Sequence, residues 1–503
     1  MSESLQMTPN GRRLAGGTAV LLGVRAAGLV MGLAVSIMLA RGLGVRALGT
    51  FATALALVHI GSTLTDFGLS ALLVREGADA PTLRAAMLRW ATRARIVSGL
   101  AVLLVLVAVT FVLIPDTQSR ISVLLVVSTV PLTALTLGMT LLQQRLMLSR
   151  MALLLLIQSA LWLAMVAVLF AVHSDLRAYA VSFVVYNAAY GLLVHRVARR
   201  ALSGPAEPMT LRQFTVKMRD VVPLSMTFVL VILYYKLDAL FVYRFAGAAA
   251  AGSYAVAYRF LDQLAIIPVT LGNLFLPLLS RRHRSGQPMQ PMFERYLRIT
   301  LVLTTPAVCL GLVLARPLIG LFPADYADAV LLLRLLLPAF VPSACGYVLV
   351  HTAIVHHRSK MQLFAACIGL FVNVALNLVF VPRYGARAAA VITLLTELGV
   401  VFTLYLFLRG PCLLVLPWRW LTRLAAVLAG SGGAALLLLA NPYVAGAAFV
   451  VVFTSGVVLL SVVDLSEIRT LLQRTPPEPA LTASAETVEE PADLVPEVVG
   501  PEH

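Results

Sequence analysis

Residues 14–40 read LAGGTAVLLGVRAAGLVMGLAVSIMLA, an apolar stretch with one charged side chain, Arg25. About 20 apolar residues in a helix cross a hydrocarbon core of about 30 Å, so this stretch predicts a membrane span. It is too long for the apolar core of a cleavable signal peptide, and we expect it to be retained. Over the whole chain, 60% of the 503 residues are hydrophobic and 12% are charged. This composition excludes a water-soluble fold.

Apolar stretches of similar length recur along nearly the whole sequence. They predict an all-α integral membrane protein of about 14 transmembrane helices, because a backbone in lipid must satisfy its own hydrogen bonds and the stretches are too long for barrel strands. The predicted spans are 14–40, 47–74, 96–114, 121–144, 151–172, 178–198, 221–245, 252–279, 297–320, 329–355, 361–381, 387–408, 421–440 and 443–463.

Lysine and arginine are distributed unevenly between the two sides of this topology. In the predicted loops, 27 lie on the side of the N-terminus and eight on the opposite side. Because cytoplasmic loops are enriched in these residues, we expect both termini in the cytoplasm and the protein in the cytoplasmic (inner) membrane. Short loops and anionic lipid account for the formal net charge of +16. The sequence offers no soluble basic domain for nucleic acid.

Two segments that follow predicted spans repeat each other. Residues 41–54 read RGLGVRALGTFATA, and residues 244–257 read RFAGAAAAGSYAVA. With a shift of 203 residues, the identical pairs include Arg41/Arg244, Gly44/Gly247, Gly49/Gly252, Ala52/Ala255 and Ala54/Ala257. The glycines permit a tight reversal between two helices. Both copies join an outward-going span to an inward-going one, which predicts two six-helix lobes related by an axis along the membrane normal.

This repeat divides the chain into five predicted segments. They are the N-lobe at 1–200, a cytoplasmic inter-lobe linker at 201–220, the C-lobe at 221–410, two further spans at 411–465, and a tail at 466–503. The last 29 residues hold seven acidic residues and six prolines, with no lysine or arginine. That composition predicts a disordered, acidic cytoplasmic tail.

A few ionisable side chains fall inside the predicted spans. A charge at bilayer depth costs roughly 2.5–3.5 kcal/mol, so each one needs a partner, water or a function. They are Arg25 in the first span, Asp66 near the end of the second, Lys236 and Asp238 in the seventh, Arg259 and Asp262 in the eighth, and Glu397 in the twelfth.

The spacing of these charges restricts their partners. Arg259 and Asp262 are i,i+3 neighbours, so they either form a salt bridge or contact a ligand. Lys236 and Asp238 point about 200° apart on a helix and should not pair. Arg25 has no acid in its own span, which leaves an acid on another helix, a hydrated cavity or an anionic ligand. Since most of these charges lie in the opening helices of the two lobes, they favour a cavity with a cationic component between the lobes.

The sequence shows no motif for catalysis or for a cofactor. None of the three lysines follows a glycine, so a phosphate-binding P-loop is absent. No metal-binding cluster of cysteine and histidine and no nucleophile elbow is present, and the predicted extracytoplasmic loops are short. We therefore expect a protein that is not an enzyme and that holds no metal or cofactor.

Five segments in both predicted lobes have a familiar pattern. They are ARGLGVRALGTF (40–51), DFGLSALLVR (66–75), YYKLDALFVYRFAG (234–247), AGSYAVAYRF (251–260) and VPRYGARAAA (381–390). Together they resemble the multidrug/oligosaccharidyl-lipid/polysaccharide exporter superfamily, and within it the bacterial polysaccharide repeat-unit flippases. The resemblance implies an inverted-V fold that works by alternating access. It also implies movement of an undecaprenyl-diphosphate-linked oligosaccharide from the cytoplasmic to the outer leaflet.

The leading hypothesis is therefore a flippase for a lipid-linked oligosaccharide, working in membrane lipid beside glycosyltransferases and a glycan polymerase. The residues expected to contact the diphosphate or acidic sugars are Arg25, Lys236, Arg259, Arg41 and Arg244. The residues expected to hold these cations in place, or to bind a coupling ion, are Asp238, Asp262, Asp66 and Glu397. The alternatives are a cation-coupled multidrug antiporter, a lipid II flippase of the same superfamily, and a non-transporting scaffold for envelope assembly.

Overall fold

The computed structural model describes residues 9–79, 81–145, 147–202, 207–219 and 222–462. Within these ranges, all regular structure is helical. The α-helices are α1 (Pro9–Asp66), α2 (Leu69–Asp79), α3 (Arg84–Leu113), α4 (Thr117–Val127), α5 (Gly138–Gln144), α6 (Leu148–Ala171), α7 (Leu176–Ala201), α8 (Leu211–Arg219), α9 (Val222–Leu264), α10 (Ile266–Arg284), α11 (Gln290–Val313), α12 (Ala315–Ile319), α13 (Ala329–Leu336), α14 (Phe340–Val355), α15 (Ser359–Tyr384), α16 (Ala386–Arg409), α17 (Trp418–Leu437) and α18 (Pro442–Leu459). Short 3-10 helices are η1 (Pro81–Leu83), η2 (Pro131–Leu137), η3 (Ala324–Tyr326) and η4 (Leu337–Ala339). The tail predicted at 466–503 lies outside the described residues.

Twelve helical stretches in the described ranges are long and apolar enough to cross a membrane. Two of them, Gly23–Asp66 with 44 residues and Ser225–Arg284 with 60, have two to three times the length of one crossing, which takes about 20 residues. Inside these two stretches, Gly44 has a φ of 72° and Gly247 a φ of 89°, a conformation that interrupts a helix. The all-α, multi-pass membrane fold is thus confirmed. A count of fourteen, which divides each long stretch into two spans, stays a prediction.

The outer surface of the helices is apolar, as lipid contact requires. Large hydrophobic side chains such as Val112, Phe371 and Leu437 are 78%, 75% and 87% exposed. Exposed apolar side chains in such numbers, spread over many helices, are typical of a surface that faces hydrocarbon rather than water.

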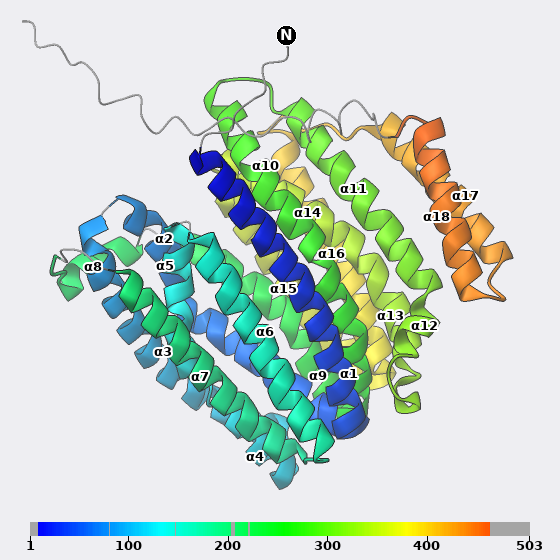
Figure 1. Cartoon of the computed structure of the whole chain (residues 1–503). Coiled ribbons are helices and arrows are strands. Elements are labelled where there is room, and N and C mark those ends of the chain that lie inside the picture. Colours follow the sequence, from blue (N-terminus) through cyan, green and yellow to red (C-terminus); the bar gives the residue numbers. More distant parts are fainter. Residues whose placement is uncertain (1–8, 80, 146, 203–206, 220–221, 463–503) are drawn as a thin grey trace, which may run out of the picture.

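Helix α1 packs most extensively on α9 and α6. Figure 1 shows α2 to α8 on the left, α11, α12, α13, α17 and α18 on the right, and α1 beside α9 near the middle. We call helices α1 to α7 the first bundle and α9 to α16 the second bundle. Helices α17 and α18 pack on each other and on α11 at the edge of the second bundle.

Part of the predicted linker is helical and packed. Phe214 of α8 is buried and stacks on Trp90 of α3 with 6.4 Å between ring centroids. The indole Nε1 of Trp90 donates a hydrogen bond of 2.8 Å to the carbonyl oxygen of Met209. The described part of this segment is thereby attached to the first bundle.

The repeated glycines bring α1 and α9 into backbone contact. A Cβ added to Gly49 would lie 1.8 Å from the carbonyl oxygen of Ala248, and one added to Gly252 would lie 2.1 Å from the carbonyl oxygen of Val45. These are equivalent contacts, because Val45 and Ala248 are also related by the shift of 203 residues. Gly44 and Gly247 mark this end of the molecule, which we call the hairpin end. The opposite end, where α1 begins and α10 ends, we call the basic end.

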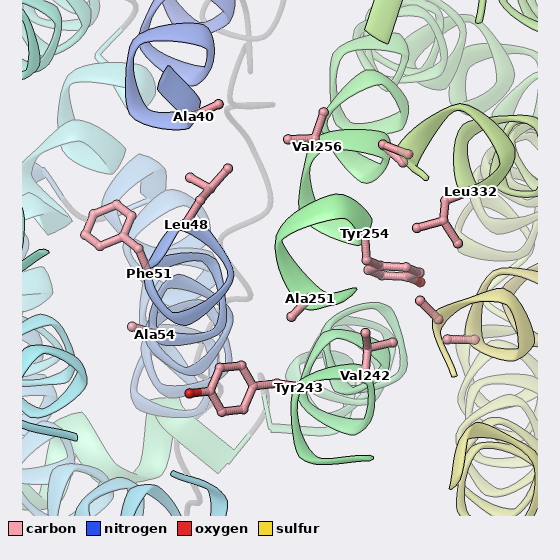
Figure 2. Packing of buried hydrophobic residues seen from close by; sticks show 14 of the residues in the cluster. Ala40, Leu48, Phe51, Ala54, Val242, Tyr243, Ala251, Tyr254, Val256 and Leu332 are labelled. Carbon is pink, nitrogen blue, oxygen red and sulfur yellow. The ribbon is translucent and has the colours of Figure 1, made fainter. Parts of the chain in front are cut away.

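Side chains around the glycines extend this contact. Figure 2 shows Leu48 of α1 pointing towards the helix that carries Ala251, and Tyr243 of that helix pointing back towards α1. The hydroxyls of Thr50 and Tyr243 lie 3.4 Å apart, and Tyr326 of η3 donates to the carbonyl oxygen of Ala40 at 3.3 Å. The first and second bundles are therefore joined firmly at the hairpin end.

Candidate functional site

A cavity of about 640 Å³ lies between α1, α6, α7 and α9. Towards the hairpin end its lining includes Leu39, Leu48, Phe51 and Ala251, next to the backbone contact of the glycines. Towards the basic end it includes Asp262, whose side chain is 46% exposed. The cavity thus has an apolar floor and a polar region with an exposed carboxylate.

The wall formed by α9 carries charge. Lys236 Nζ lies 3.6 Å from Asp262 Oδ1 and 5.0 Å from the centroid of the Tyr258 ring. Arg259 reaches across to α1, where its Nη2 donates to the carbonyl oxygen of Gly32 at 3.1 Å. With two cations and one carboxylate, this wall is net positive. Its cations keep donors to spare, because an ammonium has three and a guanidinium five.

The wall formed by α6 and α7 is aromatic and polar without charge. Trp162 of α6 lies 5.4 Å from the ring of Phe183 and 5.1 Å from that of Tyr186, both on α7. The polar residues beside these rings that line the cavity are Gln158, Ser159 and Asn187. Spacings of three and four residues place each set on one face of its helix. Sequence reasoning missed this wall because uncharged side chains leave no mark on a charge inventory, although their i,i+3 and i,i+4 spacing in apolar spans is a usable signal.

His59 of α1 is a second functional candidate that the charge inventory missed. It lines the same cavity as Lys236 and Asp262, and it is exposed there. An imidazole carries one nitrogen that donates and one that accepts a hydrogen bond when it is neutral, so it adds a polar group to the α1 side of the cavity. Counting histidine among the ionisable residues of the spans would have found it.

Asp238 lies behind the cavity wall, inside the second bundle, with 1% of its surface exposed. Its carboxylate accepts hydrogen bonds from Asn377 Nδ2 at 2.8 Å and from Thr393 Oγ1 at 2.7 Å. Both donors have a second acceptor in their own helices, since Asn377 also donates to the carbonyl oxygen of Asn373 and Thr393 to that of Ala389. The carboxylate is surrounded by polar oxygen and amide groups, and its charge is not matched by a salt bridge within the described residues.

Glu397 of α16 is also buried, with 3% of its surface exposed. Its Oε1 has no hydrogen-bond partner among the described residues. Nearby on α9 and α14, the hydroxyls of Tyr235 and Ser343 are 2.6 Å apart. Glu397 and Asp238 are therefore two carboxylates in the interior of the second bundle.

The remaining predicted residues lie around the cavity rather than in it. Asp66 forms a salt bridge of 2.9 Å with Arg95 of α3 and accepts a hydrogen bond from Ser70. Arg41 donates to the carbonyl oxygen of Leu321 at the hairpin end, and Arg244 lies over the ring of Phe245. Arg25 is half-buried on α1, on the face that continues into the cavity-lining Gly28 and Gly32.

The structure thus brings together Lys236, Arg259 and Asp262 in one cavity. The described lining of this cavity does not include the other six predicted residues, which are Arg25, Arg41, Arg244, Asp66, Asp238 and Glu397. The substrate and coupling roles given to all nine residues stay predictions.

Comparisons with known proteins fit this architecture. The solved structures that resemble the chain include the lipid II flippase MurJ in an inward closed conformation, with a TM-score of 0.72, 14% identity, and coverage of 91% of this chain and 100% of that one. They also include a multidrug resistance MATE family transporter of the MOP superfamily in an inward-facing conformation, with a TM-score of 0.65, 11% identity, and coverage of 78% and 98%. A MOP superfamily transporter from Pyrococcus furiosus matches with a TM-score of 0.59, 13% identity, and coverage of 80% and 95%. No curated protein matches the sequence.

The sequence itself matches a known family over more than half of its length. The profile described as polysaccharide biosynthesis protein covers residues 14–283 of the 503. This range contains α6, α7, α9 and the cavity-lining part of α1, so it contains the whole cavity. The chain belongs to the polysaccharide biosynthesis protein family, and its multi-pass membrane fold is shared with the MurJ and MATE structures.

Proposed function

We propose that this protein is a flippase that moves an undecaprenyl-diphosphate-linked oligosaccharide across the cytoplasmic membrane, without catalysing a reaction. The observation that carries the proposal is the pair Lys236 and Arg259 on one wall of a cavity between the two bundles. A diphosphate is anionic and accepts charge-assisted hydrogen bonds from such cations. The polyprenyl chain would remain in the lipid while the headgroup occupies the cavity.

Alternating access is the movement that this arrangement supports. The bundles touch through Gly49 and Gly252 at the hairpin end, so a headgroup leaves there only after α1 and α9 separate. We propose that the basic end is cytoplasmic, that both termini lie on that side, and that the headgroup enters there. The moving units are the lobes at 1–200 and 221–410, with 201–220 as the linker and 411–465 as an appended helix pair. Glycosyltransferases would supply the substrate, and a glycan polymerase would consume the product.

Energy for the movement would enter through the second bundle. A carboxylate buried as deeply as Asp238 is expensive to keep ionised unless a cation or a proton neutralises it. We therefore propose that Asp238, together with Glu397, takes up a coupling cation, either a proton or a metal ion. For Asp262 and Asp66 we propose charge pairing instead, since Asp262 forms a salt bridge with Lys236 and Asp66 forms one with Arg95.

Transport in liposomes tests the proposal. Purified protein should translocate a fluorescent lipid-diphosphate-oligosaccharide, and Lys236→Ala or Arg259→Ala should each slow translocation at low substrate concentration by roughly 10- to 100-fold. This is the effect of losing about 1.5–3 kcal/mol from a hydrogen bond to a charged group. Arg383→Ala is the matched control, because Arg383 is exposed and does not line the cavity.

The alternative functions give different results in the same assay. A multidrug antiporter would move cationic drugs and leave the lipid-linked glycan in place. A lipid II flippase would move lipid II in preference to other lipid-linked glycans. A scaffold would translocate neither, and its cellular function would tolerate the loss of Lys236 and Arg259. Any of these results would replace the proposed function.

A further inference from the structure

The aromatic and amide wall of the cavity has a chemistry that anion binding does not use. Trp162 is at its centre, since its ring stacks on Phe51 at an interplanar angle of 13° and also contacts the rings of Phe183 and Tyr186. Phe51, Trp162, Phe183 and Tyr186 all line the cavity. They face it from the first bundle, whereas the charged residues come from α9.

Aromatic side chains in a helical bundle often serve only to pack its core. Here the series of contacting rings, which we call the aromatic ladder, has a buried part and a part that lines the cavity. Tyr190 continues it by stacking on Tyr186 at 6.3 Å, yet Tyr190 is buried and is not a lining residue. Trp162 and Phe183 are only half-buried and meet the cavity. The aromatic ladder therefore extends from the core of the first bundle to the cavity, where Trp162 and Phe183 expose part of their ring surface.

Polar groups border this ring surface on both helices. Gln158 and Ser159 lie on α6 within one turn of Trp162, and Asn187 follows Tyr186 on α7. Asn187 donates one amide hydrogen to the carbonyl oxygen of Phe183 at 2.8 Å, and an amide has a second hydrogen and an acceptor oxygen besides. Gln158 is a hydrogen-bond partner of the Tyr186 hydroxyl. Its amide, like that of Asn187, has further donor or acceptor atoms, which are costly to bury unless water or a ligand meets them.

A sugar ring matches this combination of surfaces. One face of a pyranose presents C–H groups, which pack on an aromatic ring, and its rim presents hydroxyl or acetamido groups, which need both donors and acceptors. Apolar lining with a few placed polar groups is also the general pattern of small-molecule sites. The α9 wall, in contrast, offers charge to a phosphate.

We propose that the wall of Trp162, Phe183, Tyr186, Gln158 and Asn187 is a glycan subsite that binds the sugar nearest the diphosphate. The sugar ring packs on Trp162, and its hydroxyl or acetamido groups bond to Gln158 and Asn187. The diphosphate lies on the opposite wall, at Lys236 and Arg259. This subsite rests on the proposed function, because it presumes a substrate with a glycan and a diphosphate. It would orient that headgroup across the cavity.

Binding of two kinds of probe separates the walls. One probe is undecaprenyl diphosphate, and the others are undecaprenyl diphosphate carrying a single N-acetylglucosamine, galactose or glucose, each measured with the protein in lipid nanodiscs. The wild type should bind at least one glycosylated probe about 10-fold more tightly than the sugar-free one. Trp162→Leu and Gln158→Leu should each abolish this preference and leave the affinity for undecaprenyl diphosphate unchanged. Trp162→Phe should retain most of the preference.

Two controls make the result specific. Tyr190→Leu removes a ring of the same ladder outside the cavity and should keep the preference, while Lys236→Ala should weaken binding of every probe. Unchanged binding of undecaprenyl diphosphate shows that the Trp162 variant is folded. A wild type that binds all probes equally, or a Trp162→Leu protein that keeps the preference, overturns the glycan subsite alone. A wild type that binds no probe overturns the proposed function.

Discussion

Gly49→Ala is expected to prevent closure of the hairpin end and to reduce transport by about tenfold or more. The added Cβ would stand 1.8 Å from the carbonyl oxygen of Ala248, whereas non-bonded heavy atoms rest at about 3.5 Å. Helices α1 and α9 would have to separate by more than about 1 Å. Overpacking of this kind costs about 1–3 kcal/mol, which displaces a two-state equilibrium by roughly 5- to 150-fold.

Thiol labelling measures this displacement directly. Ser36 lines the cavity, so Ser36→Cys, introduced after replacement of the four native cysteines, reports when the cavity opens to the hairpin side. A membrane-impermeant reagent added from that side should label the cysteine faster in the Gly49→Ala protein. Gly399→Ala is the matched control, because no atom lies within 4 Å of a Cβ at this helical glycine. Equal labelling rates and normal transport in the Gly49 variant would contradict the role of the contact.

Asp238→Asn is expected to abolish coupling while leaving the protein folded and stable. Its hydrogen-bond donors, Asn377 and Thr393, each have a second acceptor on their own helix, so neither is stranded. The amide has nearly the same shape as the carboxylate, and it removes the cost of burying a charge that no described salt bridge matches. We therefore expect the melting temperature to stay within about 2 °C of the wild type, because about 1 kcal/mol displaces it by about 2–4 °C in a domain of about 150–250 residues and by less in a larger protein. Transport should fall to the rate measured without an ion gradient.

The measurement compares melting temperature in detergent with transport under an imposed proton or sodium gradient. Thr393→Val serves as the control, because it removes a hydrogen-bond partner of Asp238 but leaves the charge, and it should destabilise the protein more than Asp238→Asn does. If Asp238→Asn keeps its response to the gradient, Asp238 is not the coupling site. If it unfolds instead, the carboxylate is structural.

The fold could be predicted from the sequence because its main determinants are local. The length of each apolar stretch gives the spans, and the repeated RGLG and RFAG segments gave the reversals that the structure places at Gly44 and Gly247. The second pair of glycines was predicted to help the same reversal. In the structure, Gly49 and Gly252 serve mainly to bring two backbones together, which depends on a partner far away in the sequence.

The candidate site could be predicted in part. Charged residues are rare in membrane spans, so the sequence alone identifies Lys236, Arg259 and Asp262 as candidates, and these three share the cavity. The partners of these charges were not predictable, since the contact between Arg259 and Gly32 joins helices more than 200 residues apart. Arg41 and Arg244 were chosen for their place in the repeat, and they lie outside the cavity lining for that same reason, at the hairpin end.

The contact between the repeats is a two-fold interface within a single polypeptide. Val45 meets Gly252 as Ala248 meets Gly49, so each surface patch binds its own equivalent, as in the isologous interface of a homodimer. Complementarity of this kind arises from one surface rather than from two matched ones. A half-length subunit that associates with a second copy of itself would already form this contact. Joining two such subunits into one chain would preserve the contact without further adaptation.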